Sequence, residues 1–214
     1  SWNEKVIIDD AFAAKHFDAL REFVRRWRND RQDDTNNQRL SALVTFDVKG
    51  NGHCLFRSLA QSLHHNTHRI ILQPKEEYEK AMKLRLKSIR YICQNGGGKT
   101  FPEINMPLSF KNSIMTELKP PTDAEFAKYC RCQYDPDLPK CIPEKLFKWG
   151  GFNEIHALSN IMKKTIIILV RKNKTQYNRI RIGKNCNSKP LYIIYVNDSH
   201  YKALFPIVEL LLKL

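Results

Sequence analysis

The sequence contains no uninterrupted apolar run of the ~18 residues that a membrane-spanning helix requires. Its longest apolar stretches, 165–170 and 191–196, are only as long as a strand. With eight glycines and ten prolines among 214 residues, the chain is neither collagen-like nor of low complexity. It begins without a methionine and without an apolar secretory leader, so we expect a piece of a longer protein. Its length predicts one globular domain.

Acidic residues are missing from one long segment. The chain has 36 Lys and Arg against 22 Asp and Glu, and residues 163–189 contain nine basic residues and no acid. Such an excess of positive charge makes nucleic acid or an anionic membrane a candidate partner. Within the segment, residues 177–183 alternate, with Arg179 and Arg181 on one face and isoleucines on the other. This pattern is typical of a solvated hairpin with an apolar inner face, which is our main interpretation.

The spacing of the six cysteines does not indicate a disulfide framework. The chain is long enough to bury its own core, so disulfides are not needed for stability, and we expect free thiols in a reducing compartment. Cys130, Cys132 and Cys141 could be three zinc ligands, but their spacing lacks the usual C-x(2–4)-C pair and the following histidines. We therefore expect no metal site there.

Hydrophobic periodicity divides the chain into an early helical part and a late strand part. Apolar residues at helical spacing predict helices over 9–28, 54–65, 75–94, 122–132 and 152–162. Short apolar or alternating runs predict strands over 165–171, 177–183, 191–197 and 201–205, and a short extended segment over 40–48. This order predicts an α+β fold, or a three-layer arrangement of the α/β/α type.

One segment combines the features that a reactive cysteine needs. Gly50 and Gly52 form a turn that leads directly into the predicted helix, and Cys54 falls at the N-terminus of that helix. The helix dipole and the unpaired N–H groups there favour a thiolate and lower the pKa of the thiol. The N–H groups of the turn can also converge on a developing oxyanion. The structural alternative is a buried cysteine that begins an amphipathic helix.

A thiol nucleophile also needs a base, and His200 is placed to be one. It follows the strongly apolar strand 191–197. The end of a core strand is a rigid mount for a catalytic side chain. His53 adjoins Cys54, but neighbouring residues rarely point at each other, so we favour His200.

Three segments resemble the ovarian-tumour (OTU) family of cysteine proteases, which cleave ubiquitin and ubiquitin-like conjugates. The family's first motif is D-G-x-C-[LF]-[FY]-R-[SA], and residues 51–58 read N-G-H-C-L-F-R-S. The second is W-G-G-x-x-E-[IL]-x-A-L, and residues 149–158 read W-G-G-F-N-E-I-H-A-L. The third is a strand that ends in H-[YF], which here is His200-Tyr201. The order and spacing also agree, over residues from about 44 to 205.

The resemblance implies a fold and an active site. It implies a papain-like OTU fold, with a small and mainly antiparallel central sheet flanked by helices. The whole chain, 1–214, would be one catalytic domain with an N-terminal helical extension over about 1–40 and a variable helical region over about 70–145. Cys54 would be the nucleophile and His200 the general base. The N–H groups of Asn51, Gly52 and His53, with that of Cys54, would form the oxyanion hole.

The third member of the triad departs from the family pattern. Many relatives carry Asp or Asn two residues after the histidine, where this chain has Lys202. In an extended segment, residues two apart share a face, so we expect Asp198 to orient the His200 ring, with Asn197 as the second candidate. The rival is an acid from the N-terminal region, which would be Asp47 or one of Asp30, Asp33 and Asp34.

The resemblance implies a deubiquitinase that hydrolyses isopeptide bonds at the C-terminal glycine of ubiquitin. The expected partners are ubiquitin, polyubiquitin chains and ubiquitin-like modifiers, and the chemistry requires no metal and no organic cofactor. We expect a monomer that acts in the cytoplasm, as an effector on host ubiquitin if it comes from an intracellular bacterium, parasite or virus. Two alternatives stay open: a ubiquitin-binding pseudoenzyme, and a module that binds nucleic acid or membrane through the basic hairpin.

Overall fold

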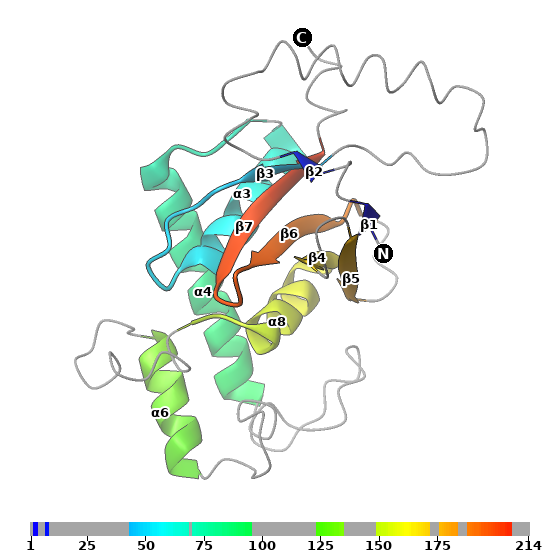
Figure 1. Ribbon diagram of the computed structural model, residues 1–214. Coiled ribbons are helices and arrows are strands. Elements are labelled where there is room, and N and C mark those ends of the chain that lie inside the picture. The colour runs from blue at the N-terminus through cyan, green and yellow to red at the C-terminus, as the bar shows by residue number, and fades with distance from the viewer. Residues whose placement is uncertain are drawn as a thin grey trace, which may run out of the picture.

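The computed structural model describes residues 2–3, 7–8, 43–68, 70–95, 123–134, 149–171, 176–183 and 188–206. In these parts of the chain, helices pack against a twisted sheet (Figure 1). The helices are α3 (Cys54–His68), α4 (Pro74–Asn95), α6 (Asp123–Tyr134) and α8 (Phe152–Met162). The strands are β1 (Trp2–Asn3), β2 (Ile7–Ile8), β3 (Leu43–Phe46), β4 (Ile166–Arg171), β5 (Gln176–Ile182), β6 (Leu191–Val196) and β7 (His200–Pro206).

The sheet is mixed, and its centre comes from the last third of the chain. The strand order is β1-β5-β4-β6-β7-β3-β2. Strands β4 and β6 are parallel, as are β2 and β3, and the other neighbouring pairs are antiparallel. The strand β3, which precedes the first helix of the core, pairs with β7 near the end of the chain. This pairing joins segments about 160 residues apart in the sequence.

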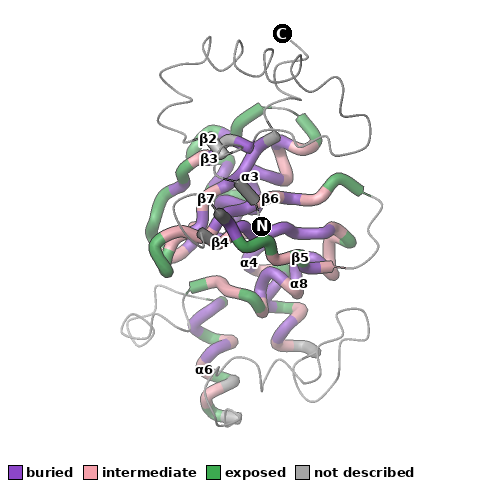
Figure 2. Tube along the Cα trace, turned by 45° about the vertical axis from the view of Figure 1, so that its right-hand side comes forward, coloured by how far each residue is buried: buried purple, intermediate pink, exposed green. Residues whose placement is uncertain are grey.

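The core follows the alternation of strand residues. Ile166 and Ile168 of β4 face the helices and pack with buried side chains of α3, α4 and α8. Their neighbours Ile167 and Leu169 face the opposite side and belong to a second apolar cluster. Because both faces of β4 are buried, the strand reads as a continuous apolar run rather than an alternating one. Figure 2 shows the buried residues concentrated in the sheet and in the helix faces against it.

The helix α3 lies directly against the sheet and carries the predicted nucleophile. Its buried residues Leu55, Phe56 and Leu59 belong to the main core cluster, and the hydroxyl of Ser62 donates to the Tyr192 carbonyl of β6 at 2.7 Å. The helices α4 and α8 complete this layer, and α6 lies beside α4 (Figure 1). Within the described residues, no helix is both long and apolar enough to cross a membrane.

The structure confirms the predicted α+β class. The four helices predicted after residue 50 are present, and the four late strands begin and end within one residue of their predicted bounds. The exposed Arg179 and Arg181 lie on β5 as expected. The helix predicted over 9–28 lies outside the described residues. The sequence analysis did not foresee the short strands β1 and β2.

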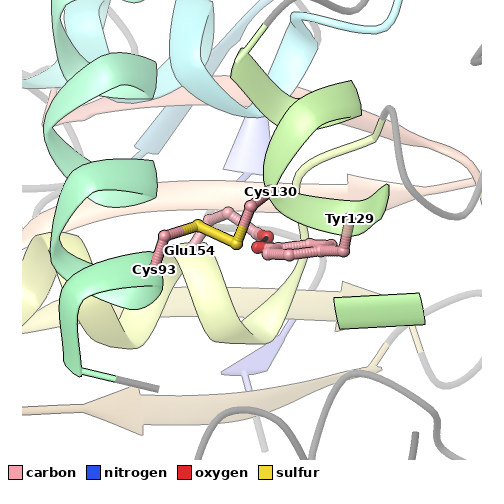
Figure 3. The surroundings of a disulfide bond; sticks show 4 residues. All are labelled: Cys93, Tyr129, Cys130 and Glu154. Atoms are coloured by element: carbon pink, nitrogen blue, oxygen red, sulfur yellow. Dashed lines mark hydrogen bonds between the residues drawn. A yellow bond between two sulfur atoms is a disulfide. The ribbon is translucent and has the colours of Figure 1, made fainter. Parts of the chain in front are cut away.

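The expectation of free thiols throughout is wrong. Cys93 of α4 and Cys130 of α6 form a disulfide bond, with their Cα atoms 6.1 Å apart (Figure 3). Cys132 is disulfide-bonded as well, so neither member of the C-x-C pair offers the thiolate that zinc requires. Cys93 and Cys130 lie 37 residues apart in the sequence, and only the packing of α6 beside α4 brings them together. Cys54 is free.

Candidate active site

The free thiol of Cys54 lies at the first residue of α3. Gly52 in the preceding turn has a φ of 86°, a left-handed conformation that a residue with a Cβ rarely adopts. The His53 carbonyl then accepts the first helical hydrogen bond, from the Arg57 N–H at 2.9 Å. The glycine turn therefore ends where the sequence predicts and leaves Cys54 half-buried at the helix N-terminus.

His200 lies at the first residue of β7 and binds a carboxylate. Its Nε2 is 2.8 Å from Oδ1 of Asp47. The same carboxylate oxygen accepts the N–H of Val48 at 3.0 Å, and Lys202 Nζ lies 3.9 Å from the other oxygen. A Cβ added to Gly50 would meet the Cε1 and Nδ1 atoms of His200 at 3.5 Å, so Nδ1 is on the side of the glycine turn. The carboxylate thus holds Nε2 and leaves Nδ1 facing the turn that carries the thiol.

Strand pairing explains why Asp47 reaches His200. The strands β3 and β7 are antiparallel, and Phe46, the last residue of β3, pairs with Ala203. Asp47 continues from β3 along the beginning of β7, where Lys202 and His200 lie. The sequence analysis left Asp47 open as a rival acid, because the sequence alone does not specify which strand lies beside β7. The other rivals, Asp30, Asp33 and Asp34, lie outside the described residues.

The expectation that Asp198 shares a face with His200 is wrong in its geometry. It required an extended segment, but residues 197–199 form the turn of the β6–β7 hairpin. Asn197 and Asp198 have φ values of 51° and 50°, in the left-handed region that Asn and Asp tolerate better than most residues. Both are exposed there, and the ring of His200 has Asp47 as its carboxylate partner.

The surroundings of the thiol act on its charge in opposite directions. Burial raises the pKa of Cys54 and outweighs the other effects. The backbone N–H groups of Tyr201 and Leu55 donate to the sulfur and lower the pKa, whereas the negative charge of Asp47 raises it. The sequence analysis expected the helix N-terminus to dominate, and this expectation is wrong because burial disfavours the thiolate more strongly. The Tyr201 hydrogen bond places the sulfur beside β7, one residue from His200.

The turn before Cys54 has an exposed part and a buried part. Asn51 is exposed, whereas the side chain of His53 is buried. The His53 ring accepts a hydrogen bond at Nδ1 from Arg85 at 3.2 Å and meets the ring of Tyr78 edge-on. This ring therefore lies against two residues of α4, which fits the choice of His200 as the base.

The W-G-G segment packs on the back of the catalytic helix. A Cβ added to Gly150 would lie 2.6 Å from a methyl group of Leu55 and 3.0 Å from the ring of Phe56, so only glycine fits without a shift. Gly151 caps α8, and its N–H donates to Glu154 Oε2 at 2.6 Å. The Tyr129 hydroxyl donates to the same carboxylate from α6 (Figure 3). The second motif thus packs against the helix that carries Cys54 and links it to α8 and α6.

The described residues hold no group of three or more His, Cys, Asp or Glu side chains placed to bind a metal ion. A thiol at a helix N-terminus, near an imidazole that binds a carboxylate, is the arrangement of a cysteine hydrolase. The comparison with protein families gives the particular group: residues 49–202 match OTU-like cysteine proteases. The chain belongs to this family, as the resemblance implied.

Comparisons with individual proteins give more distant similarities. The chain is 29% identical over 161 residues to a protein of Tipula iridescent virus named "Putative ubiquitin thioesterase L96". The match covers 75% of this chain but only 16% of that protein's length. Among solved structures, the Hazara virus OTU bound to ubiquitin is 16% identical, with a TM-score of 0.48 and coverage of 76% of this chain and 80% of the other. For the OTU domain of OTUD1 the identity is 13%, the TM-score 0.47 and the coverage 87% and 95%.

Proposed function

We propose that this chain is a deubiquitinase that hydrolyses isopeptide bonds at the C-terminal glycine of ubiquitin. Cys54 is the nucleophile, His200 the general base and Asp47 the residue that orients the imidazole. The observation that carries the proposal is the 2.8 Å contact of Asp47 with His200 beside a free, half-buried thiol. Membership of the OTU-like cysteine proteases and the name of the viral relative support ubiquitin as the substrate.

The raised pKa of Cys54 supports a first step in which His200 accepts the thiol proton. Because burial keeps the proton on the sulfur, the imidazole must remove that proton as the sulfur attacks the isopeptide carbonyl. The imidazolium then protonates the departing lysine amine, which leaves ubiquitin bound to Cys54 as a thioester. His200 next takes a proton from water, whose attack releases the ubiquitin carboxylate and restores the thiol. In each imidazolium state, Asp47 accepts the Nε2–H bond and stabilises the positive charge.

The oxyanion in both steps forms at the substrate carbonyl oxygen. The proposed donors are the N–H groups of Asn51, Gly52 and His53 in the glycine turn, together with that of Cys54 at the start of α3. Such fixed backbone donors stabilise charge that develops only in the transition state. The turn lies directly before the nucleophile, which supports this assignment.

A ubiquitin probe with a C-terminal electrophile tests the proposal directly. The expected result is a covalent adduct on Cys54, located by peptide mass spectrometry. Cys54→Ala should abolish both the adduct and the cleavage of ubiquitin chains while the circular dichroism spectrum is unchanged. Cleavage retained by the variant would contradict the assignment of the nucleophile.

A non-catalytic ubiquitin-binding role is the second candidate, and Lys202 favours it, because it stands where the family pattern has Asp or Asn. In that case the probe would bind reversibly and form no adduct. Polyanion binding through the exposed Arg179 and Arg181 can coexist with either role and would weaken steeply with salt. Action on polyubiquitin chains and ubiquitin-like modifiers, a monomeric state and a cytoplasmic site of action belong to the same proposal.

A further inference from the structure

A single buried arginine holds the turn that precedes the nucleophile. The side chain of Arg85, on α4, is fully buried, with an exposed fraction of 0%. Its Nη1 donates to the Gly52 carbonyl at 3.3 Å and to Nδ1 of His53 at 3.2 Å. Its Nε and Nη2 donate to the backbone and side-chain oxygens of Gln133, on α6, at 2.9 and 3.0 Å. One guanidinium therefore joins the glycine turn to two helices behind it.

The bond to the Gly52 carbonyl fixes the direction of the next N–H. In a trans peptide unit, the C=O of one residue and the N–H of the following residue point in opposite directions. The described chain contains no cis peptide bond, so the Gly52 carbonyl that points toward Arg85 directs the His53 N–H away from α4. A rotated peptide would present a carbonyl oxygen in place of that N–H, and an oxyanion would be repelled by it.

The burial of the guanidinium makes this orientation difficult to leave. A buried arginine needs acceptors for its N–H groups, because a desolvated and unpaired cation is very unfavourable. If the turn rotated, Arg85 would lose two acceptors, those of Gly52 and His53. The other anchors of the guanidinium are rigid, since Gln133 also donates to the Trp149 carbonyl at 3.3 Å. Burial raises the pKa of Glu154, which caps α8, and the positive charge of Arg85 opposes that rise.

We propose that Arg85 is a positioning residue, which holds the Gly52–His53 peptide with its N–H facing the oxyanion that forms at Cys54. This inference rests on the proposed function. If it is correct, the loss of Arg85 should affect two reactions of the Cys54 sulfur differently. Acyl transfer builds an oxyanion and needs the oriented turn, whereas alkylation by iodoacetamide builds none.

The test compares Arg85→Met with Gln61→Met as a matched control. Gln61 is also fully buried, but its hydrogen bonds go to the backbone of Leu72 and to Glu77, away from the turn. Three quantities are measured per folded molecule: kcat and KM on a fluorogenic ubiquitin substrate, and the rate of Cys54 alkylation followed by mass spectrometry. For Arg85→Met we expect kcat to fall about 100- to 1,000-fold, with KM and the alkylation rate within about threefold. For Gln61→Met we expect all three within about threefold.

Each outcome supports or overturns the inference. A parallel fall of kcat and alkylation in Arg85→Met would show a structural role only, and an unchanged kcat would show no role. If Arg85→Met does not fold, Gln133→Met decides instead, because it removes one acceptor of the guanidinium and leaves the turn intact. There kcat should fall about 3- to 30-fold at constant alkylation, and an unchanged kcat would overturn the inference. Turnover absent from the wild-type chain would instead reject the proposed function and this inference with it.

Discussion

Asp198 is two residues from His200 in the sequence and Asp47 is 153 residues away, yet Asp47 lies against the ring. Asp198 belongs to the turn between β6 and β7, where local backbone geometry directs it to solvent. Asp47 follows β3, which the sheet places beside β7. Proximity in the sequence is therefore a weak guide to which carboxylate contacts a given histidine ring. Strand pairing decides it, because it aligns whole segments in register.

The largest effect on catalysis should come from Asp47, the carboxylate that is distant from His200 in the sequence. We expect Asp47→Ala to lower kcat about 10- to 10,000-fold, the span seen when the orienting residue of a triad is removed. The reason is that His200 would lose the acceptor that fixes its ring and stabilises the imidazolium. Turnover of a fluorogenic ubiquitin substrate measures the effect, with circular dichroism to verify the fold. A kcat of Asp47→Ala within twofold of the wild-type value would show that another group orients the His200 ring.

A second long-range contact, the disulfide between α4 and α6, can be tested by stability. We expect Cys93→Ser to lower the free energy of unfolding by about 2–4 kcal/mol, because the open chain gains freedom when unfolded. Urea denaturation under non-reducing conditions measures the loss. Cys130→Ser should cost the same, and the double variant no more than either single one. Additive losses would show that the two sulfurs do not act as one bond.

The pH dependence of Cys54 alkylation compares the effect of the helix N-terminus, which is local, with that of burial, which depends on the tertiary structure. The helix N-terminus lowers the pKa of Cys54 and burial raises it, and burial dominates. Because alkylation requires the thiolate, we expect the midpoint of the alkylation rate to lie at a higher pH than that of a free cysteine. Asp47→Asn should move the midpoint down, since the charge of Asp47 raises the pKa. A wild-type midpoint below that of free cysteine would show that the local helix effect prevails.

The basic strand β5 should matter little to catalysis. It is separated from β7 by β4 and β6, which puts it about 14 Å from the strand of His200 at the usual strand spacing. We expect the double charge reversal of Arg179 and Arg181 to Glu to change kcat/KM by less than about tenfold. Kinetics at two salt concentrations check this. A larger loss would place this face at the substrate.

The smallest effect on catalysis should come from Asp198, the carboxylate that is nearer to His200 in the sequence. We expect Asp198→Ala to keep kcat within about threefold of the wild type, because its side chain lies in an exposed turn and not against the ring. The assay is the one used for Asp47→Ala, run side by side so that the two losses can be divided. A loss equal to that of Asp47→Ala would restore the expectation drawn from the sequence.

The sequence by itself determined four of the helices and the longer strands, and it was sufficient to propose Cys54 and His200 as the two reacting side chains. The apolar runs specify β4 and β6, the 3–4 spacing specifies α3 and α8, and the glycine turn places Cys54 at a helix N-terminus. These features are local, since each depends on side chains within a few residues of one another. The three motifs at 51–58, 149–158 and 200–201, in this order, were sufficient to predict the family to which the chain belongs.

Only the tertiary structure decided which carboxylate binds His200, which cysteines pair, and whether burial or the helix N-terminus controls the thiol. It also revealed Arg85, which looks in the sequence like any charged residue of an amphipathic helix but is fully buried. Each of these depends on contacts between segments tens to more than a hundred residues apart. Local periodicity carries no information about such contacts, because the packing of strands and helices sets them only when the whole chain has folded.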